Sequence, residues 1–174
     1  NGTTSFNLDP TQIGTVSTWA LVRAGNLYST AVRTDGTLWG WGTNGSSQLG
    51  DGTITTRTSP TQIGTATDWS IVAPSGGGSH TLAIKTGGTL WAWGLGTSNQ
   101  LGDGAGTTRS TPTQIVTDTT WAKVVPGSSH SLGLKADGTL WAWGLNSSNQ
   151  LGDGTTTTRT TPTQIGTDTT WAQI

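Results

Sequence analysis

The heptapeptide GTLWAWG stands at residues 88–94 and again at 138–144, and the near copy GTLWGWG stands at 36–42. Successive side chains of a β-strand point to opposite faces. The two tryptophans of each copy therefore share one face, and the leucine and the small residue between the tryptophans lie on the other. Such a bulky face and such a small face can interlock when similar strands pack on both sides. The motif predicts strands buried between neighbouring sheets.

The heptapeptide belongs to a longer internal repeat. The segment PTQI recurs at 10–13, 60–63, 112–115 and 162–165, and QLGDG recurs at 48–52, 100–104 and 150–154. Each unit reads as four short strands, which in the third unit are TWAKVVP (120–126), HSLGLKA (130–136), TLWAWG (139–144) and TPTQI (161–165). Four antiparallel strands in every 50 or so residues indicate a blade of a β-propeller.

Turn chemistry separates the second strand from the third in each unit. Asp35-Gly36, Gly87-Gly88 and Asp137-Gly138 stand at these places. Such dipeptides supply the positive φ angles that a two-residue hairpin turn requires. The sequence therefore predicts three tight hairpins of this kind.

The chain is expected to form one all-β domain over residues 1–174 with about three and a half four-stranded blades. The repeat units cover approximately 14–63, 64–115 and 116–165, with a leading strand at 6–13 and a partial unit at 166–174. Counting 10–13 and 170–174 as strands gives fourteen, which is half of a seven-bladed ring.

An open row of blades would expose an apolar face at each end, which a soluble monomer rarely tolerates. Three arrangements would cover these faces: further repeats in a longer protein, a two-fold pair that forms a closed ring, or head-to-tail joining. The chain contains no methionine and begins with Asn1, which favours a piece of a longer product.

Composition excludes several classes of function. The net charge of −1 argues against a nucleic-acid partner and against binding to anionic membranes. No apolar run approaches the roughly 18 residues that span a bilayer, so no membrane insertion is expected. There is no cysteine and no glutamate. We expect no cofactor, no metal and no catalytic residue.

With these motifs in view, the sequence resembles the RCC1-type repeat (regulator of chromosome condensation). The matching segments are SHTLAIKTGGTLWAWGLGTSNQLGDG at 79–104 and SHSLGLKADGTLWAWGLNSSNQLGDG at 129–154. The first unit departs from them by having Tyr28 and Thr30. The resemblance implies a seven-bladed RCC1-like β-propeller. It implies no single function, because the family includes exchange factors, ubiquitin-ligase modules and bacterial protein inhibitors. An exchange factor would need a wedge-like insertion and basic residues, and neither is found.

A structural role is expected for the repeated aromatic residues and for the two histidines. The tryptophans are interpreted as packing between blades, with an aromatic platform for sugars or methylated cations as the alternative. His80 and His130 occupy the same repeat position as Tyr28, which favours a structural role at a strand start over a base or a ligand. The residues concerned are Trp39, Trp41, Trp91, Trp93, Trp141, Trp143, His80 and His130.

The QLGDG loops carry the candidate binding residues, which are Asp51, Asp103, Asp153, Arg57, Arg109 and Arg159. Each aspartate is interpreted as shaping its loop; a calcium site is the alternative, although each loop offers only one carboxylate. The arginines either pair with these aspartates or with neighbouring blades, or they form a ring on the rim that contacts a partner.

Glycosylation is a further expectation, conditional on secretion by a eukaryote. The patterns at Asn1, Asn44 and Asn146 fit N-linked acceptors, and the threonine-rich loops could carry O-linked sugars. A plain polar loop is the alternative for the latter.

These observations favour a non-enzymatic propeller that binds a protein through its rim loops, in a secreted or cell-surface protein of bacterial type. The alternative is a structural repeat that forms an extracellular fibre or scaffold by joining blade to blade. Self-association as a homodimer or a head-to-tail oligomer belongs to both.

Overall fold

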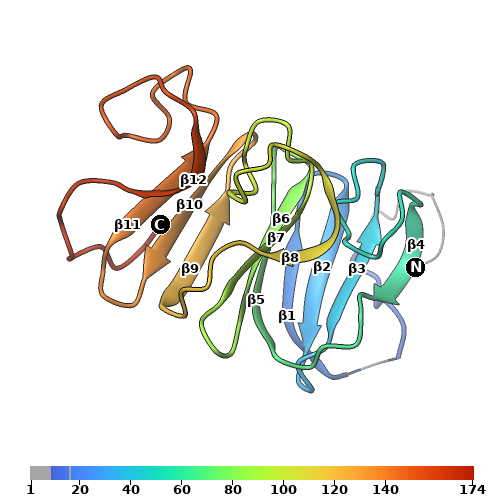
Figure 1. The fold of residues 1–174 in the computed structure, drawn as a ribbon. Coiled ribbons are helices and arrows are strands. Elements are labelled where there is room, and N and C mark those ends of the chain that lie inside the picture. Colours follow the sequence, from blue (N-terminus) through green and yellow to red (C-terminus); the bar gives the residue numbers. More distant parts are fainter. Residues whose placement is uncertain (1–8, 16) are drawn as a thin grey trace.

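The computed structural model describes residues 9–15 and 17–174, and within them the chain forms β-strands and no helix. The strands make three four-stranded antiparallel sheets, each in simple sequence order (Figure 1). The first blade contains β1 (Trp19–Ala24), β2 (Tyr28–Arg33), β3 (Leu38–Gly42) and β4 (Arg57–Gln62). The second contains β5 (Trp69–Pro74), β6 (His80–Lys85), β7 (Leu90–Gly94) and β8 (Arg109–Gln114). The third contains β9 (Trp121–Pro126), β10 (His130–Lys135), β11 (Leu140–Gly144) and β12 (Arg159–Gln164). The predicted all-β architecture of four-stranded blades is confirmed.

The hairpin turns differ from the prediction in one respect. In the β2–β3 turn only Gly36 has a positive φ, of 78°, and Asp35 does not. The Gly36 N–H donates to the Arg33 carbonyl, and the Arg33 N–H donates to the Thr37 carbonyl. This is a three-residue hairpin loop, with a tight turn followed by a left-handed glycine. Asp35 serves the turn with its carboxylate, which accepts hydrogen bonds from the N–H and the hydroxyl of Thr37 at 3.0 and 2.7 Å.

Consecutive blades lie against each other and enclose the apolar core between them (Figure 1). We call the side of a blade that meets the preceding blade its leading face, and the side that meets the following blade its trailing face. We call the contact between two consecutive blades a joint. At the second joint, between the second and third blades, Leu90 and Ala92 on the trailing face of the second blade pack with Trp121 and Trp143 of the third. The small faces and the bulky faces of the GTLWxWG strands therefore interlock as the alternation predicts.

The two end segments are not strands. Residues 10–13 and 170–174 were expected to be strands, and neither forms one, while 6–8 of the expected leading strand lie outside the described residues. Each blade has its first strand at one edge of the sheet and its fourth at the other. Segment 10–13 corresponds to a fourth strand and 170–174 to a first, and among the described residues neither has the neighbouring strand with which it would pair. For the same reason they could not complete a blade by pairing with each other.

Among the described residues there is no helix of the length and apolarity needed to cross a bilayer.

Candidate functional site

Three polar loops lie on one rim of the molecule, because each connects the third and fourth strands of its blade (Figure 1). They cover residues 43–56, 95–108 and 145–158. The six predicted binding residues lie in these loops or at the start of the strand that follows each loop. The structure brings them together in pairs, Asp51 with Arg57, Asp103 with Arg109 and Asp153 with Arg159.

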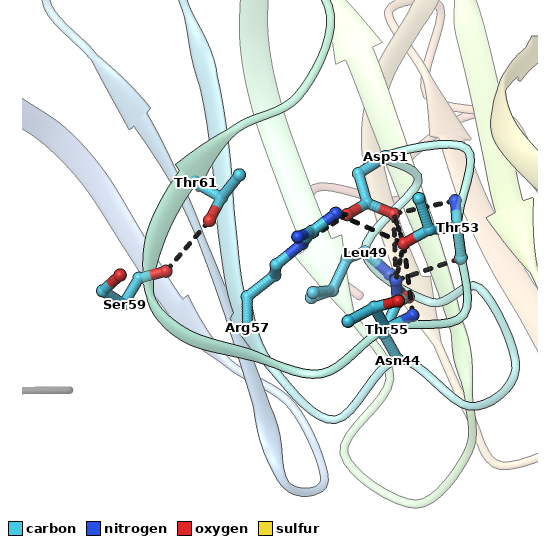
Figure 2. Close-up of polar contacts among 8 residues, drawn as sticks. All are labelled: Asn44, Leu49, Asp51, Thr53, Thr55, Arg57, Ser59 and Thr61. Atoms are coloured by element: carbon cyan, nitrogen blue, oxygen red, sulfur yellow. Dashed lines mark hydrogen bonds and ion pairs between the residues drawn. The ribbon is translucent and has the colours of Figure 1, made fainter. Parts of the chain in front are cut away.

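Asp51 is the centre of the first loop (Figure 2). One carboxylate oxygen accepts hydrogen bonds from the Thr53 N–H and hydroxyl at 3.0 and 2.8 Å and from the Asn44 amide at 2.9 Å. The other oxygen accepts Nε and Nη2 of Arg57 at 2.7 and 2.5 Å. The Asn44 side-chain carbonyl in turn accepts the Leu49 N–H at 3.0 Å. The loop is therefore fixed by its own polar groups.

The third loop repeats this network, and the second repeats part of it. Asp153 accepts from Thr155, Arg159 and Asn146. Asp103 pairs with Arg109 at 2.7 Å. In the second loop Gly96 replaces the asparagine, and the Thr107 carbonyl oxygen lies 2.0 Å from where a Cβ of residue 96 would be. The backbone of the second loop thus closes over the space that the asparagine fills in the other two.

The networks keep two of these carboxylates ionised. Burial by itself would raise the pKa of Asp51, but hydrogen bonds from Thr53, Arg57 and Asn44 outweigh it and hold the pKa below its ordinary value. The Thr155 hydroxyl is the main cause that lowers the pKa of Asp153 to about 2. Both oxygens of Asp51 and of Asp153 already face N–H and O–H donors, an arrangement that stabilises a carboxylate but opposes a cation. The geometry therefore favours the loop-shaping interpretation over calcium.

The arginines face outward as well as inward. Their side chains are 32, 38 and 32 % exposed at Arg57, Arg109 and Arg159, whereas the paired aspartates are 6 to 7 % exposed. Each guanidinium is anchored by its aspartate and keeps part of its surface on the rim. The two sequence interpretations, pairing within the loop and presentation to a partner, are thus compatible. The first loop adds Ile54, which is 70 % exposed.

Two of the predicted N-glycosylation sites are buried. Asn44 and Asn146 are fully buried, and each amide nitrogen donates hydrogen bonds inside its loop. A sugar at either position would have to break this network, so the structure contradicts both sites. Asn1 lies outside the described residues.

The same loops also connect the blades. The indole N–H of Trp93 donates to the Gln48 carbonyl at 3.0 Å, and that of Trp143 donates to the Gln100 carbonyl at 2.9 Å. The Gly52 N–H donates to the Ser110 carbonyl of the next blade at 2.9 Å. Sequence reasoning missed the role of these glutamines because they act through the backbone. The recurrence of QLGDG was the signal that could have found them.

His80 lies inside the second joint. Its Nε2 is 3.0 Å from the Ser131 hydroxyl oxygen, which itself donates to the Gln100 carbonyl at 2.7 Å. Because the Ser131 hydrogen is used in that bond, Nε2 of His80 must carry the proton. Burial lowers the pKa of His80 to about 3, so the ring is neutral. A fully buried neutral ring cannot serve solvent-borne substrate as a base. His130 stands on the trailing face of the third blade, half-buried.

Tyr28 does at the first joint what His80 does at the second. Its hydroxyl donates to the His80 carbonyl at 2.6 Å, lies 3.1 Å from the Thr81 hydroxyl, and accepts the Ser75 N–H at 2.9 Å. Burial raises the pKa of Tyr28 to about 12. This repeat position therefore holds a ring that reaches into the next blade.

The first tryptophan of each GTLWxWG strand packs within its own blade. Trp39, Trp91 and Trp141 lie edge to face with Trp19, Trp69 and Trp121 at ring distances of 5.8, 5.7 and 5.9 Å. A cation of the same chain already lies over each ring: Arg33 at 3.6 Å from Trp39, Lys85 at 4.5 Å from Trp91 and Lys135 at 3.8 Å from Trp141. These contacts occupy one face of each of these three rings, which a methylated cation bound to an aromatic platform would otherwise use.

Comparison with protein families gives one consistent result. The model described as the regulator of chromosome condensation (RCC1) repeat matches residues 35–84, 87–134 and 137–174. A second model of the same description matches 71–100 and 121–150.

This chain matches only part of the length of each individual relative. The chain is 32 % identical to the ultraviolet-B receptor UVR8 of Arabidopsis thaliana over 91 residues, which are 52 % of this chain and 21 % of the receptor. It is 32 % identical to the human E3 ubiquitin-protein ligase HERC2 over 107 residues, 59 % of this chain and 2 % of the ligase.

Among solved structures, human WBSCR16 matches with a TM-score of 0.74 at 23 % identity, over 84 % of this chain and 37 % of the other. Prp20p from Saccharomyces cerevisiae matches with a TM-score of 0.73 at 21 % identity, over 84 % and 38 %. These similarities show the fold, and this chain spans less than two fifths of either structure.

Proposed function

This chain belongs to the RCC1 repeat family, and from that premise we propose that it is a non-enzymatic module that binds another protein through the rim loops. The carrying observation is that three arginines stand on one rim, each anchored by a buried aspartate and each about one third exposed. Preorganised arginines bind with little loss of side-chain entropy, and arginine is enriched at protein interfaces.

Two further observations support this proposal. Ile54 offers an exposed apolar contact on the same rim. Among the solved relatives, Prp20p was described with its binding to Gsp1p and histones, and yeast RCC1 was solved with Kap60 bound. A protein partner at the rim is in keeping with those cases.

The proposed setting is a secreted or cell-surface protein. Its surface loops are rich in threonine, serine and asparagine and nearly uncharged, and the chain has no cysteine to oxidise. We do not propose a nucleic-acid partner, since eight basic residues against nine acidic ones provide no excess positive charge. O-linked sugars on the threonine-rich loops remain part of the proposal.

Site-specific photo-crosslinking tests the rim. A photoreactive residue replaces Ile54 or Thr156 on the loop rim, and, as the matched control, Thr34 or Ala136 on the opposite rim. All four are exposed. In extracts and culture medium of the source cells, the two loop positions should crosslink to the same protein and the two controls should not. Equal yields from both rims, or none from either, would refute the proposal. Localisation is checked by fractionating the cells and probing medium, surface and interior.

A second candidate function, a structural repeat in an extracellular fibre or scaffold, is favoured by a different observation. Val22 on the leading face of the first blade is 51 % exposed, whereas its counterpart Val72 in the second blade is fully buried. The end blades thus retain uncovered apolar faces.

A further inference from the structure

The leading face of the first blade is the uncovered copy of a face that is buried twice elsewhere. Trp93 and Trp143 are fully buried in the joints, whereas Trp41 at the same repeat position is half-buried. Val72 and Val124 are 0 and 6 % exposed, against 51 % for Val22. The same side chains that fill the two joints are therefore available on the first blade.

The trailing face of the third blade is the uncovered copy of the other half of the joint, which the first and second blades use. His80 and Gln100 are fully buried, while their counterparts His130 and Gln150 are half-buried. Gly102 is buried beneath Trp143, and its counterpart Gly152 is exposed. The chain thus carries both halves of its own joint, one at each end.

The polar groups of the joint are also present at both ends. In each formed joint a glutamine carbonyl accepts from an indole N–H and from a hydroxyl, as Gln48 accepts from Trp93 and Thr81. A glycine N–H donates to the outer strand of the next blade, as Gly104 donates to the Thr160 carbonyl at 3.0 Å. On the trailing end the acceptor and the donor are the Gln150 carbonyl and the Gly154 N–H. On the leading end the matching groups are the Trp41 indole, the Ser29 hydroxyl and the Thr58 carbonyl.

We propose that the trailing face of the third blade binds the leading face of the first blade of a second copy of this chain, reproducing the joint that occurs twice within it. The two surfaces differ from each other, so the contact is heterologous and extends copies head to tail. The joint uses the backbone of the third rim loop, at Gln150 and Gly154, but not the arginine side chains, so a failed joint would leave the proposed partner binding by the arginines untouched.

Two segments, 10–13 and 170–174, have to move away from the blade faces when the joint between two copies forms. Segment 10–13 repeats the sequence of 162–165, and Trp171 repeats the position of Trp19, so one member of each pair must leave the interface. Residues 162–164 belong to β12, and Trp19 stacks on Trp39 and Trp41 at 5.8 and 6.1 Å. By contrast, 10–13 and 170–174 form no strand, and Trp171 is 44 % exposed. The unpaired segments are therefore the ones that withdraw.

A pair of glycine variants tests the joint. A Cβ at Gly50 or Gly102 would lie 2.7 Å from the indole of Trp93 or Trp143, so a methyl group at Gly152 would collide with Trp41 of the second copy. Within one chain it would meet only the Ile165 side chain, at 4.0 Å. Gly166 is the matched control, because its φ of 65° is close to the 72° of Gly152 and a Cβ there meets nothing within 4 Å. Its counterpart Gly64 lies beside a formed joint, and a Cβ there also meets nothing within 4 Å. Both variants carry the same backbone strain, and only Gly152→Ala blocks the joint.

The measurement is the solution mass by light scattering over a wide range of concentrations. The wild-type mass should rise above 17.9 kDa with concentration. Gly152→Ala should weaken association by at least about tenfold, and Gly166→Ala should leave it near wild type. A wild-type chain that stays monomeric at every concentration would overturn the proposal. So would equal weakening by the two alanines.

A mixing experiment tests the polarity of the joint. Ser29→Arg places a charged side chain on the leading face and leaves the trailing face intact, while Gly152→Ala does the reverse. At a concentration where wild type associates and neither variant does so alone, an equimolar mixture should form a one-to-one dimer that grows no further. If Ser29→Arg abolishes association while Gly152→Ala does not, the chains meet through two leading faces and the head-to-tail joint is wrong.

Discussion

Trp93 donates its indole N–H to the backbone carbonyl oxygen of Gln48 across 3.0 Å, and the Thr81 hydroxyl donates to the same oxygen across 2.8 Å. One carbonyl thus holds two groups of the following blade, at the edge of an apolar core that includes Leu49 and Ile63. The joint is specific because the indole has to be both buried and hydrogen-bonded. Every blade carries one half of such a joint on its leading face and the other half on its trailing face.

Replacing the buried tryptophan should cost far more than replacing its exposed counterpart. Trp93→Ala should lower the free energy of unfolding by about 3–5 kcal/mol, since it leaves a cavity between two blades. Trp41→Ala, on the half-buried leading face, should cost less than half as much. Urea unfolding followed by far-ultraviolet circular dichroism measures both, and Trp93→Phe is the control that keeps most of the apolar contact. Equal losses at positions 41 and 93 would contradict burial as the cause.

Glycine variants separate backbone strain from collision in the folded chain. Gly50 and Gly52 have φ angles of 80° and 82°, so alanine is similarly strained at both. A Cβ at Gly50 would lie 2.7 Å from the Trp93 ring, whereas a Cβ at Gly52 would meet only the Thr111 methyl at 3.8 Å. We expect Gly52→Ala to cost about 1 kcal/mol and Gly50→Ala about 2–4 kcal/mol. Thermal melting with matched buffers measures the difference, and a Gly52→Ala loss as large as that of Gly50→Ala would show strain alone.

The repeat made the blades predictable, because strand alternation and turn residues are local signals. The strands from Trp19 to Gln164 follow directly from them. The prediction for the end segments was wrong for a nonlocal reason. PTQI at 10–13 and TWAQI at 170–174 have strand-like sequences, but a strand needs a partner strand, and the described residues pair none with either segment. The residue types of a segment do not indicate whether a partner strand lies next to it in the fold.

The candidate site was predictable in its residues and less so in its contacts. Asp51 and Arg57 recur together, which indicated a pairing, and the loop geometry then showed that pairing and exposure coexist. Asn44 was misread as a sugar acceptor, because the tripeptide pattern does not report burial. The proton on Nε2 of His80 follows only from the chain of hydrogen bonds through Ser131 to the Gln100 carbonyl.

The second loop offers a test of how far the repeats are interchangeable. Gly96→Asn copies the residue of the other two loops, yet its Cβ would lie 2.0 Å from the Thr107 carbonyl oxygen. We expect a loss of about 1–3 kcal/mol, because the backbone must move away. Adding Ala105→Thr and Gly106→Thr leaves Thr97 as the one difference from the third loop and should recover most of the loss. Chemical denaturation of the single and triple variants checks this; a neutral Gly96→Asn would contradict the closed backbone.

The buried histidine predicts how stability depends on pH. His80 has a folded pKa of about 3 against an ordinary value of 6.5, so below pH 6.5 the unfolded chain takes up a proton that the folded chain does not. Stability should therefore be full above pH 6.5 and fall as the pH drops towards 3, by up to about 1.4 kcal/mol per pH unit. His130, whose pKa burial also lowers, adds to the loss in the same direction.

The range between pH 6.5 and 4.5 isolates the histidines, because the aspartates with lowered pKa values lose their contribution only below about pH 4. His80→Tyr is the matched variant, since Tyr28 fills the same repeat position and its hydroxyl lies 3.1 Å from the Thr81 hydroxyl. Urea unfolding at half-unit steps of pH should give a shallower slope for His80→Tyr than for wild type, with the remainder due to His130. If the variant keeps the wild-type slope, the buried imidazole does not set the acid sensitivity of the joint.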